Sequence, residues 1–258
     1  MADYKKPDFW QQKARKEGYP ARSVYKLQEI EEKFSILKPL RVGGGTILNV
    51  LDLGAAPGSW SLYVLRKMSA GGKTAKGKLT AADLSPLSRE FDKGLFDGAN
   101  FFFVQGDITS PEVRSALLEK SPFSAVISDA APATSGNHTV DAARSLELAE
   151  AAFDYAENAL APGGSFAVKV FQGGDSGNLL KRMKQVFKTA RSFKPQACRG
   201  ESTETYFIGL GLVTEDLTLR HKGREDHKGR RISTTEDTEL YGGKIEEEFT
   251  TNQHEPVI

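Results

Sequence analysis

Three aspartates stand at or just after the ends of short apolar segments, where their side chains could bind a nucleoside. They are Asp83, Asp107 and Asp129. A carboxylate at Asp83 could accept hydrogen bonds from both hydroxyls of a ribose, and one at Asp107 could accept from the exocyclic amine of adenine. Aspartate is also common at strand ends because it favours turns. Each aspartate alone is therefore ambiguous, whereas three of them beside a glycine turn favour a nucleoside ligand.

Lys169 is the second residue whose position suggests chemistry, because it lies inside the otherwise apolar segment 164–171. A buried ammonium is costly, so it must be paired or held in its neutral form, and either state suits a base. Alternatively, Lys169 stands at the end of a strand and extends its amine into water. Neighbouring strands before Asp129 and around Lys169 would bring both side chains to one edge, which favours the paired state.

A glycine turn joins the apolar run 47–53 to a helical pattern over 58–68. Strand, tight turn and helix is the arrangement in which an open α/β sheet presents a nucleotide-sized ligand. Gly54 and Gly58 remove side chains where the backbone must approach that ligand. Their spacing is G-x-x-x-G rather than the dinucleotide fingerprint G-x-G-x-x-G. This spacing disfavours a nicotinamide or flavin enzyme and, with the aspartates, favours a site for a single adenosine.

The elements that must position these residues alternate between strand and helix patterns along the chain. This alternation predicts a largely parallel sheet covered by helices on both faces. The segment 38–46, with its three consecutive glycines, is predicted to be a loop. Strands are predicted at 47–53, 78–84, 101–104, 123–128, 165–171, 191–196 and 205–212, and helices at 20–34, 58–68, 110–120, 140–160 and 177–187.

Composition limits the class of protein and its organisation. The 258 residues can form one core with an appendage. We expect an N-terminal helical segment at 1–37, a catalytic domain at 38–217 and a charged, weakly folded tail at 218–258. No apolar stretch approaches the roughly 20 residues that span a bilayer, and no signal peptide is evident. Cys198 is the only cysteine, and no metal-binding pattern occurs, so we expect a cytoplasmic protein without a metal.

Two clusters of basic residues suggest a polyanionic partner. Residues 176–200 hold seven Lys or Arg and no acid, and residues 1–26 hold seven Lys or Arg against three acids. Aromatic residues are interleaved with the second cluster, a combination that suits RNA. A solvated helix face is the alternative explanation for the first. The residues that we expect to contact RNA are Arg15, Lys16, Arg22, Lys181 and Arg182.

Four segments together resemble one family. The segment 52–61 (DLGAAPGSWS) resembles the S-adenosylmethionine turn of the FtsJ-like RNA ribose 2′-O-methyltransferases. The segments 21–27, 128–132 and 160–171 resemble other motifs of that family, in the same order. The resemblance covers about residues 8–212. It implies a Rossmann-like methyltransferase fold with a mostly parallel seven-stranded sheet, an antiparallel last strand and helices on both faces.

The resemblance also implies the site residues. The family's K-D-K-E tetrad corresponds to Lys26, Asp129, Lys169 and Glu204, with Glu201 as a nearby rival for the last position. Ser59 departs from the usual bacterial glycine, which should be tolerated if its φ angle is negative. The residues that the resemblance assigns to S-adenosylmethionine are Gly54, Ala55, Pro57, Gly58, Trp60, Asp83, Asp107 and Asp129.

The expected activity follows from the resemblance. A ribose 2′-hydroxyl would attack the sulfonium methyl, with Lys169 deprotonating or orienting the hydroxyl. The favoured substrate is a uridine of large-subunit (23S) ribosomal RNA within a ribosomal particle, with no membrane and no obligate protein partner. A transfer RNA substrate is the alternative, because residues 13–19 read somewhat like the tRNA-modifying branch. An RNA-binding protein without activity is a further alternative, but it would have no use for Lys169 in an apolar strand.

Overall fold

The computed structural model describes residues 8–42, 44–70, 77–173, 175–200 and 202–213. The predicted tail at 218–258 and the rival Glu201 lie outside the described residues. The described elements are α1 (Phe9–Lys16), α2 (Val24–Phe34), β1 (Leu40–Val42), β2 (Gly45–Leu53), α3 (Ser59–Ala70), β3 (Gly77–Asp83), the 3-10 turn η2 (Leu95–Asp97), β4 (Phe101–Gln105), α4 (Pro111–Leu118), β5 (Phe123–Ser128), α5 (His138–Ala159), β6 (Leu160–Phe171), α6 (Ser176–Val186), β7 (Phe187–Phe193) and β8 (Glu204–Leu212).

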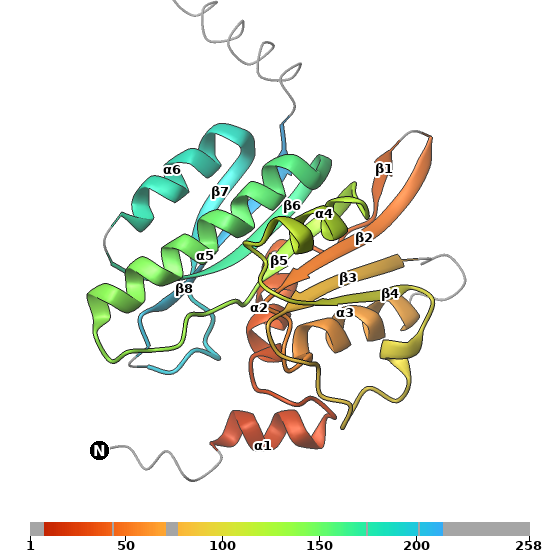
Figure 1. Cartoon of the computed structure of the whole chain (residues 1–258), viewed down its shortest axis with the longest axis horizontal. Helices are drawn as coiled ribbons and strands as arrows, with labels where there is room; N and C mark the ends of the chain where they lie inside the picture. Colours follow the sequence, from red (N-terminus) through yellow and green to blue (C-terminus); the bar gives the residue numbers. More distant parts are fainter. Residues whose placement is uncertain (1–7, 43, 71–76, 174, 201, 214–258) are drawn as a thin grey trace, which may run out of the picture. The chain divides into compact units, whose positions relative to one another are not determined.

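The sheet is the centre of the fold (Figure 1). Seven strands follow the order β4-β3-β2-β5-β6-β8-β7, and β1 pairs with β2 beside this path. The pairs from β4 to β6 are parallel, while β8 runs antiparallel to both β6 and β7. The order reverses between β2 and β5, which is where open α/β sheets bind ligands. The expected fold, including the antiparallel last strand, is confirmed.

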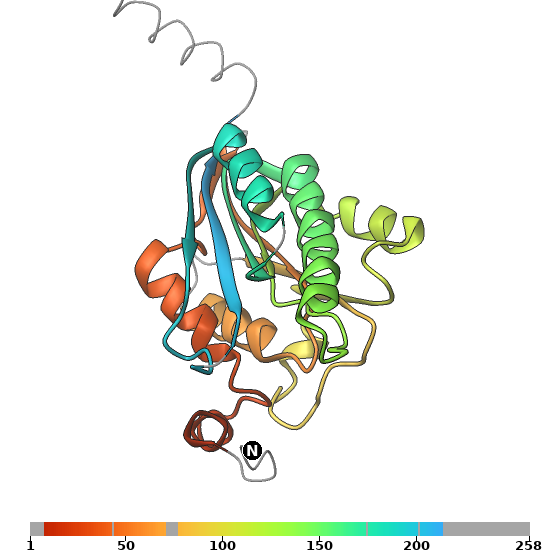
Figure 2. The same cartoon turned by 90° about the vertical axis from the view of Figure 1, so that its left-hand side faces the viewer.

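Two layers of helices cover the two faces of the sheet (Figure 2). One core contains buried residues of α4, α5 and α6, such as Leu117 and Phe153, and the other contains residues of α1, α2 and α3, such as Leu27. Consecutive strand residues point to opposite faces, so Val126 belongs to the first core and Ile127 to the second. Both faces of the central strands are therefore apolar, which explains their continuous hydrophobic runs.

Local signals set several helix starts. Asn137 caps α5 by accepting from the backbone N–H groups of Thr139 and Val140. The helix therefore starts at His138, two residues before the predicted start. Asp8 caps α1 in the same way, accepting from the backbone N–H of Gln11 at 2.9 Å. Such caps satisfy donors that the first helical turn leaves unpaired.

Two predicted boundaries are wrong. The glycine-rich segment 38–46 is not a loop, because β1 pairs antiparallel with the start of β2. Gly44 has a φ of 81°, which suits a tight hairpin turn. The strand predicted at 191–196 is β7, which starts at Phe187 because that buried ring packs under Gly209 of β8.

Candidate functional site

The glycine turn after β2 leaves no room for side chains. Gly54 has a φ of 74°, and a Cβ there would lie 2.5 Å from the Cα of Ala130. Gly58 has a φ of 109°, and its Cβ would lie 3.0 Å from the ring of Phe96. The backbone N–H groups of Gly54 and Ala55 donate to the carbonyl of Ala82, which fixes the turn against β3. The turn therefore packs directly on the loop after β5, and only glycine fits.

Asp83 and Asp107 lie together beside this turn. Asp83 accepts from the backbone N–H of Ala56 at 2.9 Å and of Ser85 at 2.8 Å. Its own carbonyl accepts from Gly106 at 2.8 Å, which brings the residue before Asp107 alongside. Each carboxylate oxygen has two lone pairs, so these bonds orient the group and leave acceptor sites open. The bond to Ser85 is also the turn chemistry that the alternative explanation predicted.

Asp107 is exposed and anionic. Its Oδ1 accepts from the backbone N–H and the hydroxyl of Thr109, both at 2.8 Å. These hydrogen bonds, the backbone one above all, lower the pKa of Asp107 below its ordinary value. A turn of small residues and two oriented carboxylates together fit an adenosine-containing group.

Lys169 meets Asp129 at the carboxyl end of β6. Its Nζ lies 3.0 Å from the Oδ1 of Asp129 and donates to the backbone carbonyl of the same residue at 2.5 Å. The side chain of Lys169 is 8% exposed, and that of Asp129 is 15% exposed. The parallel pairing of β5 with β6 places the two residues together, as the sequence predicted.

Lys26 and Glu204 form a second ion pair next to the first. The Nζ of Lys26 donates to the Oε2 of Glu204 at 2.8 Å, and both residues are buried. Lys26 comes from α2, whereas Glu204 opens β8 and lies opposite Phe171 in the register. Four charged side chains thus meet at one edge, although two of them, Lys26 and Glu204, are 178 positions apart in the sequence.

The charges of these pairs support one another. Burial raises the pKa of Asp129, but Lys169 and Lys26 outweigh it and hold that pKa below its ordinary value. Burial lowers the pKa of Lys26, but the carboxylates of Asp129 and Glu204 outweigh it and raise that pKa. Asp129 is therefore a carboxylate and Lys26 an ammonium at neutral pH, since each charge stabilises its opposite in a poorly solvated place.

Tyr206 is a member of this network that the sequence analysis missed. Its hydroxyl donates to the Oδ1 of Asp129 at 2.7 Å, and it lies opposite Lys169 in the β6–β8 pairing. Burial and the charge of Asp129 raise the pKa of Tyr206 well above its ordinary value, so the hydroxyl keeps its proton and donates. A tyrosine in a β-prone strand resembles a core residue, which is why the pattern alone did not single it out.

Trp60 and Ser59 connect the glycine turn to the N-terminal segment. Trp60 is buried, donates from Nε1 to the carbonyl of Ser23 at 2.8 Å and packs its ring 5.9 Å from that of Tyr206. The hydroxyl of Ser59 accepts from the backbone N–H of Ala21 and donates to its carbonyl. Ser59 has no positive φ, so it is tolerated as expected. These contacts hold the start of α2 against the turn.

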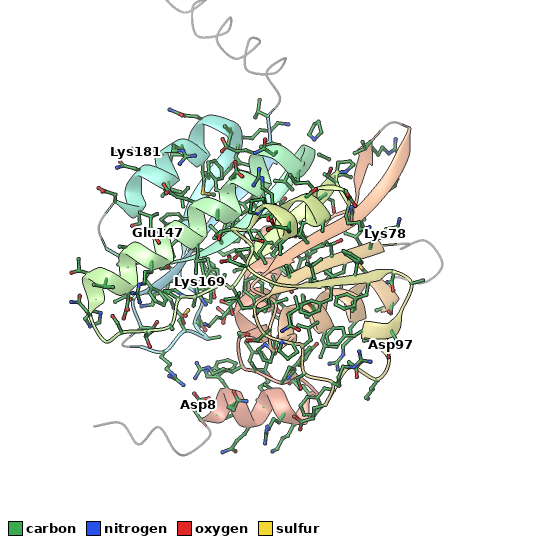
Figure 3. The ribbon with its side chains drawn as sticks, viewed as in Figure 1. Asp8, Lys78, Asp97, Glu147, Lys169 and Lys181 are labelled. Atoms are coloured by element: carbon green, nitrogen blue, oxygen red, sulfur yellow. The ribbon has the colours of Figure 1, made fainter. Side chains whose placement is uncertain are left out.

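The residues expected to contact RNA fall in two separate places. Arg15 and Lys16 are exposed on α1, and Lys181 and Arg182 are exposed on α6. Figure 3 shows Asp8, at the start of α1, and Lys181 on opposite sides of the described domain. Arg182 lies 3.4 Å from Glu150 on α5, so part of its charge is paired within the protein. Lys181 and Arg182 thus lie away from α1, whereas Arg199, from the same basic cluster, lies 4.0 Å from Asp8.

Arg22 has a structural role. One guanidinium nitrogen forms an ion pair with Asp8, and another donates to the carbonyl of Ala197 at 2.5 Å. Its side chain is 15% exposed. Glu29 accepts from the backbone N–H groups of Gln196 and Ala197. Arg22, just before α2, and Glu29, within α2, therefore bind the loop between β7 and β8, which leads to Glu204.

Two general searches of the described residues complete the picture. None of the helices in these parts of the chain is both long and apolar enough to cross a membrane. The same residues contain no group of three or more His, Cys, Asp or Glu side chains that could hold a metal ion.

Comparison with known proteins gives consistent matches. A protein from Treponema denticola named ribosomal RNA large subunit methyltransferase E is 50% identical over 207 residues, which are 80% of this chain and 96% of that protein. A protein of the same name from Borreliella afzelii is 42% identical over 202 residues, which are 78% of this chain and 96% of that protein. A crystal structure of a candidate ribosomal RNA methyltransferase from Plasmodium falciparum shows the same fold, with a TM-score of 0.61 at 24% sequence identity. The match covers 76% of this chain and 100% of that chain.

The family model of the FtsJ-like methyltransferases matches residues 19–212. This range runs from Tyr19, five residues before α2, to the end of β8, so it contains the glycine turn, the aspartates and both ion pairs. The chain belongs to the FtsJ-like methyltransferase family.

Proposed function

We propose that this protein methylates the ribose 2′-hydroxyl of a uridine in large-subunit ribosomal RNA. The chain is a methyltransferase, and S-adenosyl-L-methionine is its cofactor. The observation that carries the proposal is the Lys169–Asp129 pair, 3.0 Å apart at the carboxyl edge of the sheet beside the glycine turn. This pair places a proton-handling amine where a methyl acceptor would lie.

Residues of the edge would hold the cofactor as follows. The backbone of the turn that contains Gly54 and Gly58 would lie against the cofactor. Asp83 accepts from the ribose hydroxyls, and Asp107 accepts from the adenine amine. When bound, the cofactor supplies an electrophilic methyl group on a positively charged sulfur. Asp129 contributes a negative charge at this edge, which favours a cationic ligand.

Lys169 orients the ribose hydroxyl and, in its neutral form, takes up the hydroxyl proton. A hydroxyl is a poor nucleophile at neutral pH, so it needs a positioned base or donor. Asp129 holds the Lys169 amine through its Oδ1 and its backbone carbonyl, and Tyr206 donates to the same Oδ1. Lys26 and Glu204 form the second half of the network, with Lys26 near the phosphate of the target nucleotide.

The substrate class is inferred from the relatives. Two proteins named ribosomal RNA large subunit methyltransferase E match over 96% of their own lengths at 50% and 42% identity. Their full length is thus represented here, which supports the same substrate for this chain. We further propose that the enzyme acts in the cytoplasm on ribosomal particles.

Methyl transfer to isolated particles tests the proposal. Large ribosomal subunits from cells that lack the enzyme, and bulk transfer RNA, are incubated with labelled cofactor, and 2′-O-methylation is mapped. We expect label at a uridine of the large-subunit RNA. Lys169→Met should abolish transfer while RNA binding persists, and Lys78→Met, at an exposed lysine on β3, serves as the matched control.

Other results would change the assignment. Label in transfer RNA alone would replace the substrate class. Binding of both RNAs without any transfer would favour an RNA-binding protein that has kept only the fold. Native transfer by Lys169→Met would remove the assigned role of that side chain.

A further inference from the structure

Phe9 is the most exposed of the large apolar side chains in the described parts of the chain. Its exposed fraction is 71%, and Leu84, which follows cofactor-side Asp83, is next at 70%. Single exposed apolar residues are common on proteins. The position of Leu84 beside the adenosine cradle explains its exposure, whereas nothing in the proposed cofactor site involves Phe9. The surroundings of Phe9 therefore decide whether its exposure has a function.

The surroundings of Phe9 are aromatic beneath and basic alongside. Its ring lies edge-on to Trp10, with 5.5 Å between ring centroids, and Trp10 lies 5.0 Å from Tyr25 of α2. Lys13 and Lys16 follow Phe9 by one and two helical turns, so the three residues share a face of α1. The Lys13 Nζ lies 4.6 Å from the ring of Tyr25, which holds the lysine close to the aromatic layer. The ring of Phe9 thus packs against ordered aromatic side chains and lies near positive charge.

Contacts of α1 connect Phe9 to the segment that carries Lys26. Asp8, the residue before Phe9, caps α1 and forms an ion pair with Arg22. Arg22 precedes Lys26 by four residues, about one helical turn, and Lys26 binds Glu204 at 2.8 Å. The start of α1 is therefore fixed beside the edge that holds both ion pairs. Figure 3 shows Lys181 far from Asp8, on the opposite side of the described domain.

We propose that Phe9 is a stacking platform for an unpaired RNA base close to the target nucleotide, with Lys13 and Lys16 beside the neighbouring phosphates. The proposal rests on the proposed function, in that it takes RNA as the substrate. Every base has a π-face that can stack on an aromatic ring. In a duplex those faces are already stacked, so the platform fits bases of loops and bulges. A protein partner would have no equal need for the lysines on the same face.

The test measures stacking directly. The probe is a short RNA hairpin that carries the fluorescent base 2-aminopurine in its loop, with a fully paired duplex of the same length for comparison. Stacking on Phe9 should quench the loop fluorescence when the native protein binds. Phe9→Ala should remove the quenching and weaken hairpin binding about 5- to 150-fold, with the duplex unaffected. The slope of affinity against salt should stay the same, because no charge is lost.

Matched variants separate stacking from other effects. Phe9→Trp should restore binding and quenching, and Phe9→Leu should restore neither. Phe102→Ala is the control, because Phe102 is 39% exposed on β4 with Lys120 only 4.4 Å from its ring. Thermal unfolding should be unchanged in all of them. Lys13→Ala should lower both the affinity and the salt slope.

Three results would overturn the platform: native binding by Phe9→Ala, full rescue by Phe9→Leu, or equal weakening of hairpin and duplex. These outcomes are distinct from failure of the proposed function. If large ribosomal subunits are not methylated while quenching by Phe9 persists, the function is wrong and the platform stands. If methylation is normal and Phe9→Ala behaves as native, the platform alone is wrong.

Discussion

Replacing Asp52 with asparagine should stabilise the protein at pH 8 and destabilise it at low pH. Asp52 is fully buried at the end of β2. Its Oδ2 accepts from the hydroxyl of Ser61 at 2.6 Å, while its Oδ1 has no hydrogen-bond partner among the described residues. Burial, with the nearby charges of Asp129 and Asp83, raises the pKa of Asp52 from an ordinary 3.8 to about 7.

The sign of the effect follows from proton binding. A carboxyl whose pKa is higher in the folded state binds its proton more tightly there, so its contribution to stability is full below pH 3.8. That contribution is lost as the pH rises to about 7. A shift of about 3 pKa units corresponds to about 4 kcal/mol. An asparagine amide removes this dependence but leaves donors unsatisfied, which costs about 1–3 kcal/mol. The variant should therefore be about 1–3 kcal/mol more stable than native at pH 8 and less stable by a similar amount below pH 4.

Urea unfolding of both proteins between pH 5 and pH 8 measures this difference. Over that range the native protein should lose about 3 kcal/mol relative to Asp52→Asn. Asp97→Asn, which removes a carboxylate with 67% side-chain exposure, should give a constant difference over the same range. If the difference between native and Asp52→Asn is also constant, Asp52 is ionised at pH 5 in the fold, and its burial is not the reason for the effect.

Three further predictions concern stability near the site, each measured by urea unfolding. Gly54→Ala should cost about 2–5 kcal/mol, because a left-handed φ and the backbone of Ala130 both oppose a Cβ; Gly44→Ala, whose Cβ meets nothing within 4 Å, should cost only about 1–2 kcal/mol. Equal losses in the two would mean that the contact with Ala130 does not matter. Glu204→Gln should lower the free energy of unfolding by about 3–5 kcal/mol, because it leaves Lys26 buried without its charged partner. Glu150→Gln, at an exposed pair, should lower it by under about 1 kcal/mol. A small loss of stability in both variants would show that water reaches Lys26. Arg22→Ala should lower the free energy of unfolding by about 2–3 kcal/mol, since it removes charged hydrogen bonds to Asp8 and Ala197. Arg182→Ala should lower it by under about 1 kcal/mol. A larger loss of stability in Arg182→Ala than in Arg22→Ala would contradict a structural role for Arg22.

The parts of the site that parallel strands bring together were predictable from sequence. Carboxyl ends of neighbouring parallel strands meet at one edge, so Asp83, Asp107 and the Asp129–Lys169 pair could be placed by strand order alone. The pairing of Lys26 with Glu204 was different. The two residues are 178 positions apart, and no local pattern connects them. Only the resemblance to a family suggested that they belong to one site, and their roles remain proposals.

The misses have local causes. Three glycines at 43–45 favour a loop. However, β2 starts already at Gly45, so residues 40–42 pair with its first residues as the strand β1. Tyr206 lies among apolar residues of a β-prone strand, and only the structure shows that it faces Lys169 and donates to Asp129. The partner of Arg22 was not foreseen, because Asp8 could not be identified before α1 was placed, and the expected contact of Arg22 with RNA stays a prediction.

The insertion of β8 between β6 and β7 determines the order in which the protein can fold. During synthesis β7 emerges before β8, yet among the described strands its partner is β8. Until residues 204–212 arrive, β6 keeps an open edge that could pair with another chain. Pairings between distant segments form slowly. Among the described strands β8 is made last, so it completes the sheet, covers that edge of β6 and brings Glu204 and Tyr206 to the site in a single step. A nascent chain is therefore vulnerable to aggregation between the synthesis of β6 and that of β8, and the four charged side chains can meet only after Glu204 has been made.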